Sequence, residues 1–131
     1  MDPDTLLFFN DHPAALGLYE ALEAWLQSAF PEAQKRVQKT QITFFHRHTF
    51  ACVSFARVKK AECTEPWLTF TLGLPTPLVS CRAAVQSEPY PGRWTAHIVL
   101  HDPKDLDAEL LAWTRQAYLF SEQKTVRRRF V

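Results

Sequence analysis

The stretch WLTFTLGL, residues 67–74, alternates between the two sides of an extended chain without interruption. A period of two is the pattern of a β-strand that buries one of its faces. The face expected to be buried carries four large apolar side chains, those of Leu68, Phe70, Leu72 and Leu74. Pro75 and Pro77 follow at once and end the strand. The sequence therefore predicts a sheet with one covered side and one side open to solvent, a ligand or a partner.

The segments on either side of the strand-rich middle have the longer period of an amphipathic helix. Over residues 13–30 the apolar side chains recur at steps of three and four, which predicts a helix. Pro13 suits its first turn, and Asp11 or His12 could cap it. The polar run that follows, EAQKRVQKT (32–40), is typical of either a second short helix or a loop.

The middle of the chain contains further runs rich in β-branched and aromatic residues. QITFF and TFACVSFARV, separated by HRH, predict a hairpin between residues 41–45 and 49–58. LVSCRAAVQ (78–86) predicts a shorter strand, SEPYPG (87–92) a surface turn, and RWTAHIVLH (93–101) the last strand.

The last strand leads into HDPKDLDAELLAWTRQAY, where acidic residues crowd the expected start of a helix. Asp102 occupies the N-cap position and Pro103 the first helical position, and Asp105 and Asp107 fall in the first turn. A calcium loop of the EF-hand type needs glycine at its sixth position, which is missing here. The carboxylates are therefore predicted to be architectural. The buried stripe of the helix is formed by Leu106, Leu110, Trp113, Ala117 and Phe120.

These elements predict an α+β fold, a two-layer sandwich in which N-terminal and C-terminal helices pack on one face of a mostly antiparallel sheet of four to five strands. A chain of 131 residues has the length of one domain, so we expect residues 1–131 to form a single α+β domain with a basic C-terminal tail, 124–131. That tail, KTVRRRFV, is typical of a solvated segment. It could instead grip a phosphate backbone or an acidic helix of another subunit.

The composition limits the kinds of binding partner and the cellular compartment that we expect. A net charge of +1 gives no global electrostatic reason for a nucleic-acid or acidic-membrane partner, and no apolar run approaches the roughly 18 residues of a membrane span. Cys52, Cys63 and Cys81 are an odd number of cysteines without a CxxC spacing, which favours free thiols in a reducing cytosol. We therefore expect a cytoplasmic protein without a membrane or nucleic-acid partner.

The open side of the sheet is the predicted place for a functional site. If the leucine side of residues 67–74 faces the helices, strand alternation directs outward four side chains suited to ligand binding, those of Arg47, Trp67, Arg82 and His97. Together, guanidinium, imidazole and indole groups can hold a small anionic or planar ligand through charge-assisted hydrogen bonds and stacking. Two alternatives stay open: an ordinary solvated face, and a surface through which the protein forms a homodimer.

The five histidines invite a metal hypothesis, which the residues around them do not support. His46 and His48 share a face if both lie in a strand, and so do His97 and His101. No carboxylate is placed to complete a first coordination shell around either pair. We expect no metal site.

Motifs of covalent and cofactor chemistry are missing from the sequence. The chain has no GxSxG, P-loop, HExxH or GxGxxG pattern, and the apolar neighbours of Cys52 oppose its ionisation. We expect no cofactor, and the sequence favours a protein that is not an enzyme. If it is an enzyme, His97 is the candidate acid–base group and Arg47 or Arg82 the anion clamp.

Three segments carry a resemblance to a known family: KTQITFFHRHTFACVSF, WLTFTLGLP and GRWTAHIVLHDPKDLDAELLAWTRQAY. Their order resembles a family of uncharacterised bacterial domains, a domain of unknown function that is sometimes labelled a predicted transport protein. The likeness runs from about Ala14 to Ser121. The resemblance implies no activity and no catalytic residues, and the transport label lacks physical support because nothing in the sequence could span a bilayer.

The expected function is that of an uncharacterised cytosolic protein acting as a non-catalytic binding or adaptor module through its exposed sheet face. Its partner would be a small anionic ligand or another protein. One alternative is a small enzyme acting on an anionic substrate with a His/Arg site. Another is a homodimeric structural module.

Overall fold

The computed structural model describes residues 2–59, 61–83 and 85–128, with the side chains of 124–128 outside that description. The N-terminal part is helical, with α1 (Pro3–Phe8), a 3-10 turn (Pro13–Ala15) and α2 (Leu16–Ala29). Six strands follow: β1 (Gln34–Val37), β2 (Gln41–Phe45), β3 (Thr49–Ser54), β4 (Leu68–Leu74), β5 (Val85–Tyr90) and β6 (Arg93–Leu100). A second 3-10 turn (Pro103–Asp105) leads into α3 (Ala108–Arg128).

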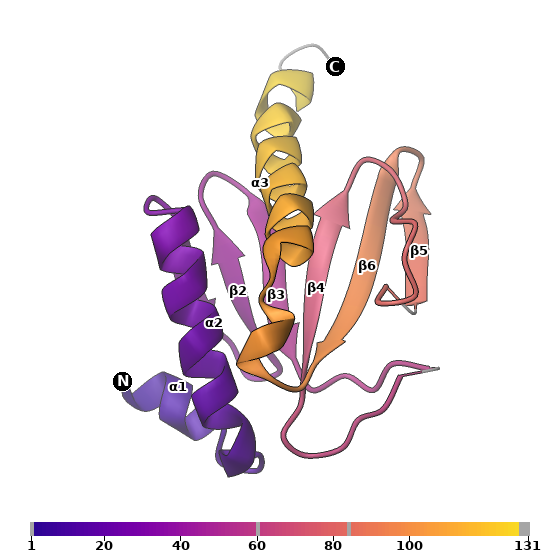
Figure 1. Ribbon diagram of the computed structural model, residues 1–131. Helices are drawn as coiled ribbons and strands as arrows, with labels where there is room; N and C mark the ends of the chain where they lie inside the picture. The colour runs from indigo at the N-terminus through magenta and orange to yellow at the C-terminus, as the bar shows by residue number, and fades with distance from the viewer. Residues whose placement is uncertain (1, 60, 84, 129–131) are drawn as a thin grey trace.

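The architecture is α+β, with one open antiparallel sheet in the order β1-β2-β3-β4-β6-β5. The helices lie on one side of the sheet, and α3 lies over β3 and β4 (Figure 1). The expectation of four to five strands is wrong, because the described chain contributes six. The short helix α1 was also not predicted.

The two outermost strands are the ones that the sequence pattern misjudged. β1 has the sequence QKRV, which was predicted as helix or loop, and it pairs with β2 from Gln34 opposite Phe45 to Val37 opposite Ile42. β5 begins at Val85 rather than at residue 78, and it includes Pro89, which an edge strand tolerates because one side of its backbone has no partner strand. Edge strands lack the apolar alternation on which the prediction rested.

The start of α3 differs from the single helix that was predicted. Asp102 and Asp105 form a capping box around a separate 3-10 turn, and Leu106 then leaves the helical region with φ −83° and ψ 68°. Asp107 caps α3 itself, because its Oδ1 accepts a hydrogen bond of 3.0 Å from the backbone N–H of Leu110. The prediction that these carboxylates are architectural agrees with these contacts.

The cap predicted for the first long helix is absent. Neither Asp11 nor His12 forms a side-chain cap at Pro13 or at the start of α2. His12 instead lies 2.6 Å from Glu65 and stacks on Phe55 with ring centroids 3.8 Å apart.

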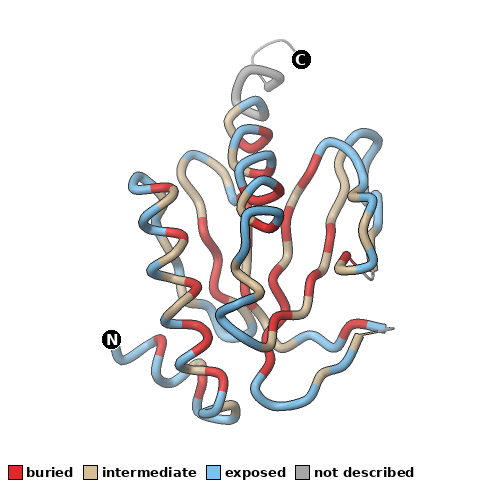
Figure 2. The backbone as a smooth tube through the Cα atoms, viewed as in Figure 1, coloured by how far each residue is buried: buried red, intermediate tan, exposed pale blue. Residues whose placement is uncertain are grey.

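The core lies between the sheet and the helices, as Figure 2 shows by the buried residues along the central strands, α2 and α3. The apolar face of β4 is fully buried, which confirms the alternation read from the sequence: Leu68, Phe70, Leu72 and Leu74. α2 contributes Leu18, Tyr19, Leu22 and Leu26, and α3 contributes Leu110, Trp113, Ala117 and Phe120. In the described part of the chain no helix combines the length and apolarity needed to cross a membrane.

Candidate functional site

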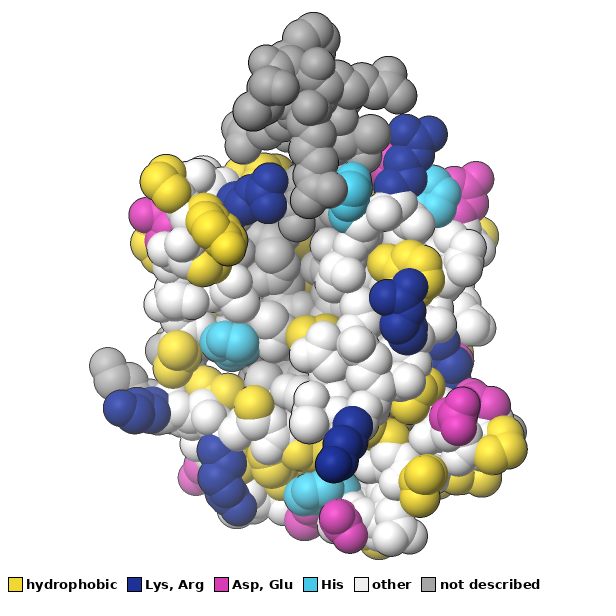
Figure 3. All heavy atoms as spheres, turned by 180° about the vertical axis from the view of Figure 1, so that it is seen from behind, with side chains coloured by type: hydrophobic (Ala, Val, Ile, Leu, Met, Phe, Trp, Pro, Cys, Tyr) yellow, Lys and Arg dark blue, Asp and Glu magenta, His cyan; other side chains and the backbone are white. Residues whose placement is uncertain are grey.

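Strand register defines the face of the sheet that points away from the helices. One row of paired residues crosses all six strands on this side: Arg36, Thr43, Cys52, Thr71, His97 and Val85. The neighbouring positions that pair on the same face include Phe45, Ser54, Gly73, Thr95 and Ser87. None of these residues is acidic. The middle of this face is largely uncharged, with acidic side chains at its rim (Figure 3).

His97 presents an imidazole on this face from the middle of β6, one strand in from the β5 edge, and it is fixed by the neighbouring strand β4. Its Nδ1 lies 2.9 Å from the hydroxyl oxygen of Thr71, the residue that pairs with it on β4. Burial lowers the pKa of His97 below its ordinary value, so the ring is neutral at pH 7. A neutral imidazole carries one donor and one acceptor nitrogen.

Cys52 lies on the other side of Thr71, on β3. The thiol is half-buried, and its residue pairs in register with Thr71. Burial raises the pKa of Cys52, and the Thr71 hydroxyl only partly offsets that effect. The thiol is therefore protonated at neutral pH, as its apolar sequence neighbours predicted.

A cavity of about 360 Å³ opens beside His97, and we refer to it as the His97 pocket. Its lining residues are Ala56, Arg57, Val58, Lys59, Val85 and His97. Two of them are cationic, three are aliphatic and none is a carboxylate. A volume of this size lies at the lower end of the range of small-molecule sites.

The wall of the His97 pocket is the connection between β3 and β4, which folds back over the sheet. The hydroxyl of Thr69, itself fully buried, donates a hydrogen bond of 2.7 Å to the backbone carbonyl of Ala56. The Arg57 guanidinium lies over the Trp67 ring, 5.7 Å from its centroid. Val58 is buried as well. These contacts hold the connection in place and make the surface next to His97 concave.

The same connection explains why Trp67 is not available on the open face. Its side chain is 2% exposed and makes edge contacts with Phe55 and His12, with ring centroids 5.4 Å and 5.9 Å away. Strand alternation directed it outward, but it cannot account for a loop that returns across the strand. The expectation of an exposed Trp67 is therefore wrong.

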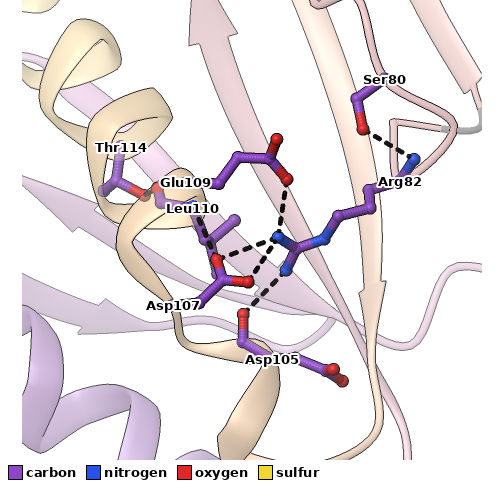
Figure 4. A network of polar contacts seen from close by, with 7 residues as sticks. All are labelled: Ser80, Arg82, Asp105, Asp107, Glu109, Leu110 and Thr114. Atoms are coloured by element: carbon purple, nitrogen blue, oxygen red, sulfur yellow. Dashed lines mark hydrogen bonds and ion pairs between the residues drawn. The ribbon is translucent and has the colours of Figure 1, made fainter.

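Arg82 lies against α3 and not on the open face (Figure 4). Its Nη1 donates to Asp107 Oδ1 at 2.9 Å and to Glu109 Oε1 at 3.0 Å, and its Nη2 donates to the backbone carbonyl of Asp105 at 2.8 Å. The guanidinium also lies over the Trp113 ring. The placement predicted for Arg82 is wrong because β5 begins only at Val85, so Arg82 belongs to a turn and does not follow strand alternation.

Arg47 lies in the turn of the β2–β3 hairpin. Its side chain is 62% exposed, and its Nε is 3.8 Å from Glu122 on α3. The structure thus separates the four residues predicted to bind a ligand: His97 lines the pocket, whereas Arg47, Trp67 and Arg82 have the other surroundings described above. Arg57 and Lys59 were missed, although the basic run RVKK after a strand was a usable signal.

The two histidine pairs do not converge. His46 Nδ1 lies 2.8 Å from Glu122 Oε1, whereas His101 Nε2 contacts the backbone carbonyl of Glu62. Within the residues that the structure describes, no group of three or more His, Cys, Asp and Glu side chains is arranged to hold a metal ion.

The described surface has other cavities of similar or larger volume. One of about 450 Å³ lies between α2 and α3 and is lined by Ala29, Phe30, Pro31, Glu32, Arg115, Tyr118 and Leu119. Another, of about 490 Å³, is lined largely by the α1 region and the ends of β2 and β3, including Phe8, His12, Lys39 and Phe55. Each of them includes a carboxylate, Glu32 in the first and Asp11 in the second, in contrast to the His97 pocket.

The fold and the open face define a two-layer α+β domain with a small cavity on its sheet. The chain belongs to the family described as Domain of unknown function (DUF5655), which it matches over residues 7–121. This match confirms the resemblance to a domain-of-unknown-function family that the sequence segments carried. Neither the curated proteins nor the solved structures gave a match to the chain.

Proposed function

We propose that the protein is a cytoplasmic, non-catalytic binding module that holds a small anionic ligand in the His97 pocket. The observation that carries this proposal is the lining of the pocket, which joins a neutral imidazole to two cationic side chains and contains no carboxylate. Charge complementarity of this kind raises the local concentration of anions and suppresses binding of cations.

The geometry favours binding over a structural role for these groups. Arg57 and Lys59 are exposed and have no ion pair among the described residues, whereas Arg82 is fully engaged with Asp107 and Glu109. A cation without an ion-pair partner is able to pair with an incoming anion without breaking an existing salt bridge. His97 adds a hydrogen-bonding group that stays uncharged.

A small enzyme acting on an anionic substrate is the second candidate, and the neutral His97 ring inside a cavity is the observation that favours it. A neutral imidazole is able to act as a general base. Arg57 and Lys59 would then replace Arg47 and Arg82 as the anion clamp. An enzyme would convert a compound that it binds into a product, and His97→Gln would abolish this turnover while leaving the affinity for the compound unchanged. A binding module would show no turnover.

The proposal is tested with a variant that removes the two cations, Arg57→Gln/Lys59→Gln. Thermal shift and calorimetry with matched pairs of small acids and their neutral amides should show that the acids bind the unaltered protein more tightly. That preference should be lost in the double variant and kept in the control Lys104→Gln, which alters an exposed lysine outside the pocket. Equal binding of acids and amides, or an unchanged preference in the double variant, contradicts the proposal.

A further inference from the structure

Three side chains on adjacent strands form a row that ends in the His97 pocket. Cys52 on β3, Thr71 on β4 and His97 on β6 pair in register across the sheet. Thr71 lies between the other two, and its hydroxyl oxygen is 2.9 Å from His97 Nδ1. The proposed function assigns no role to Thr71 or Cys52.

The row determines which nitrogen of His97 carries the proton. A threonine hydroxyl has one hydrogen to donate and lone pairs to accept with. The protonated Cys52 thiol is able to donate to it, and sulfur is a weaker acceptor than an imidazole nitrogen. The favoured arrangement is therefore donation by the Thr71 hydroxyl to His97 Nδ1. The proton of the neutral ring then resides on Nε2, as an N–H donor.

Besides His97, the lining of the pocket consists of two cationic residues, Arg57 and Lys59, and three aliphatic ones. Ala56 and Val58 come from the β3–β4 connection, and Val85 pairs with His97 from β5. Guanidinium and ammonium groups pair with carboxylates and phosphates alike, so the aliphatic residues are what narrows the ligand class. Three aliphatic residues beside the imidazole and the two cations fit a molecule that has a single small charged end and a short hydrocarbon part.

We infer that the His97 pocket takes a short-chain aliphatic carboxylate, whose oxygen accepts a hydrogen bond from Nε2–H of His97 while its alkyl part lies against Val58 and Val85. This inference rests on the proposed function and narrows its ligand class. Arg57 and Lys59 supply the long-range attraction, and Thr71 acts as a positioning residue that fixes the tautomer.

The experiment is nuclear magnetic resonance of the whole chain with isovalerate, its uncharged analogue isovaleramide, and inorganic phosphate. Long-range ¹H–¹⁵N spectra should show the Nε2–H tautomer of His97, and isovalerate should shift the signals of His97 and Val85 more than isovaleramide does. Thr71→Val, which keeps the β-branched shape, should lose the tautomer preference and weaken isovalerate binding on the order of tenfold. Thr95→Val, on the same face of β6, is the matched control and should change neither.

The results that contradict the carboxylate inference differ from those that contradict the proposed anion binding. An Nδ1–H tautomer in the unaltered protein, or equal binding of isovalerate and isovaleramide, overturns the carboxylate inference. Phosphate that shifts the His97 signals where isovalerate does not also overturns it, and leaves the proposed anion binding in place. If no anion shifts the signals of any lining residue, both the inference and the proposed function fall.

Discussion

Thr71 and His97 face each other on adjacent strands, with the threonine hydroxyl 2.9 Å from Nδ1 of the imidazole. This contact is on the side of the sheet that no described helix covers (Figure 1). Threonine on a solvated strand usually needs no partner beyond water, so a hydroxyl that links two strand neighbours constrains the ring beside it. The chemical character of the His97 pocket depends on that constraint.

The lowered pKa of His97 predicts a pH dependence of stability. Because burial lowers its pKa below the ordinary value of 6.5, the unfolded chain binds this proton more tightly than the folded chain does. The free energy of unfolding should therefore decrease as the pH falls from about 6.5 through the folded-state pKa. Urea unfolding of the unaltered protein and of His97→Gln at pH 7.5 and 5.5 measures this difference. The variant should show the smaller decrease, and an identical decrease in both proteins contradicts the assignment.

Arg82 is predicted to stabilise the fold without taking part in ligand binding. It ties the β4–β5 connection to the first turn of α3 through Asp107, Glu109 and the Asp105 carbonyl, and its side chain is only 24% exposed. Arg82→Ala should lower the free energy of unfolding by roughly 1–2 kcal/mol, partly screened by salt.

The matched control for this change is Arg47→Ala. The Arg47 side chain is 62% exposed, and its one ion pair is long, at 3.8 Å from a carboxylate oxygen. The free energy of unfolding should therefore change by no more than about 0.5 kcal/mol. Chemical denaturation at low and high salt measures both variants. Loss of ligand binding in a folded Arg82→Ala protein contradicts the placement of the site.

Gly73 is predicted to be replaceable without loss of stability. It lies on the open face of β4, and a Cβ built there meets no atom within 4 Å. Gly73→Ala should raise the free energy of unfolding by about 0.5–1 kcal/mol, because alanine loses less backbone entropy in a strand. Gly92→Ala is the contrasting change, since φ of +75° strains any residue with a side chain. A lower melting temperature for Gly73→Ala than for the unaltered protein contradicts the conclusion that this face of the sheet is uncovered at Gly73.

Thr69 is predicted to support the wall of the pocket. Thr69→Val removes the hydrogen bond to the Ala56 carbonyl and should lower stability by about 1–3 kcal/mol. It should also speed amide hydrogen exchange at residues 56–59 and weaken ligand binding. Thr114→Val removes a comparable buried bond to the Leu110 carbonyl on α3, and serves as a control that should lower stability and leave ligand binding unchanged. Equal ligand binding in both variants contradicts the role given to Thr69.

The elements that could be predicted from the sequence are those whose residues alternate between a buried and an exposed environment. The long strands β4 and β6 and the two long helices have such patterns, and His97 was placed on the open face because it lies in the middle of β6. β1 and β5 are edge strands with largely exposed side chains, so their pattern differs little from that of a loop. Their pairing depends on neighbours that are distant in the sequence.

The errors at the site have a common physical cause. Alternation directs a side chain only where a strand continues on both sides of it. Arg82 precedes β5 in a turn near α3, and Trp67 lies just before β4 and packs against Phe55 of the connection between β3 and β4. The position of that connection depends on contacts such as the Thr69–Ala56 hydrogen bond, which no local pattern encodes. Arg57 and Lys59 owe their place beside His97 to the same contacts.

The most direct test of the central claim is a residue-by-residue map of backbone amide chemical shifts during a titration with isovalerate. Binding in the His97 pocket predicts that the changes concentrate at residues 56–59, Val85 and His97. Changes centred instead on Phe30, Arg115 and Tyr118, in the hollow between α2 and α3, contradict it. So does a titration that shifts no amide on the open face.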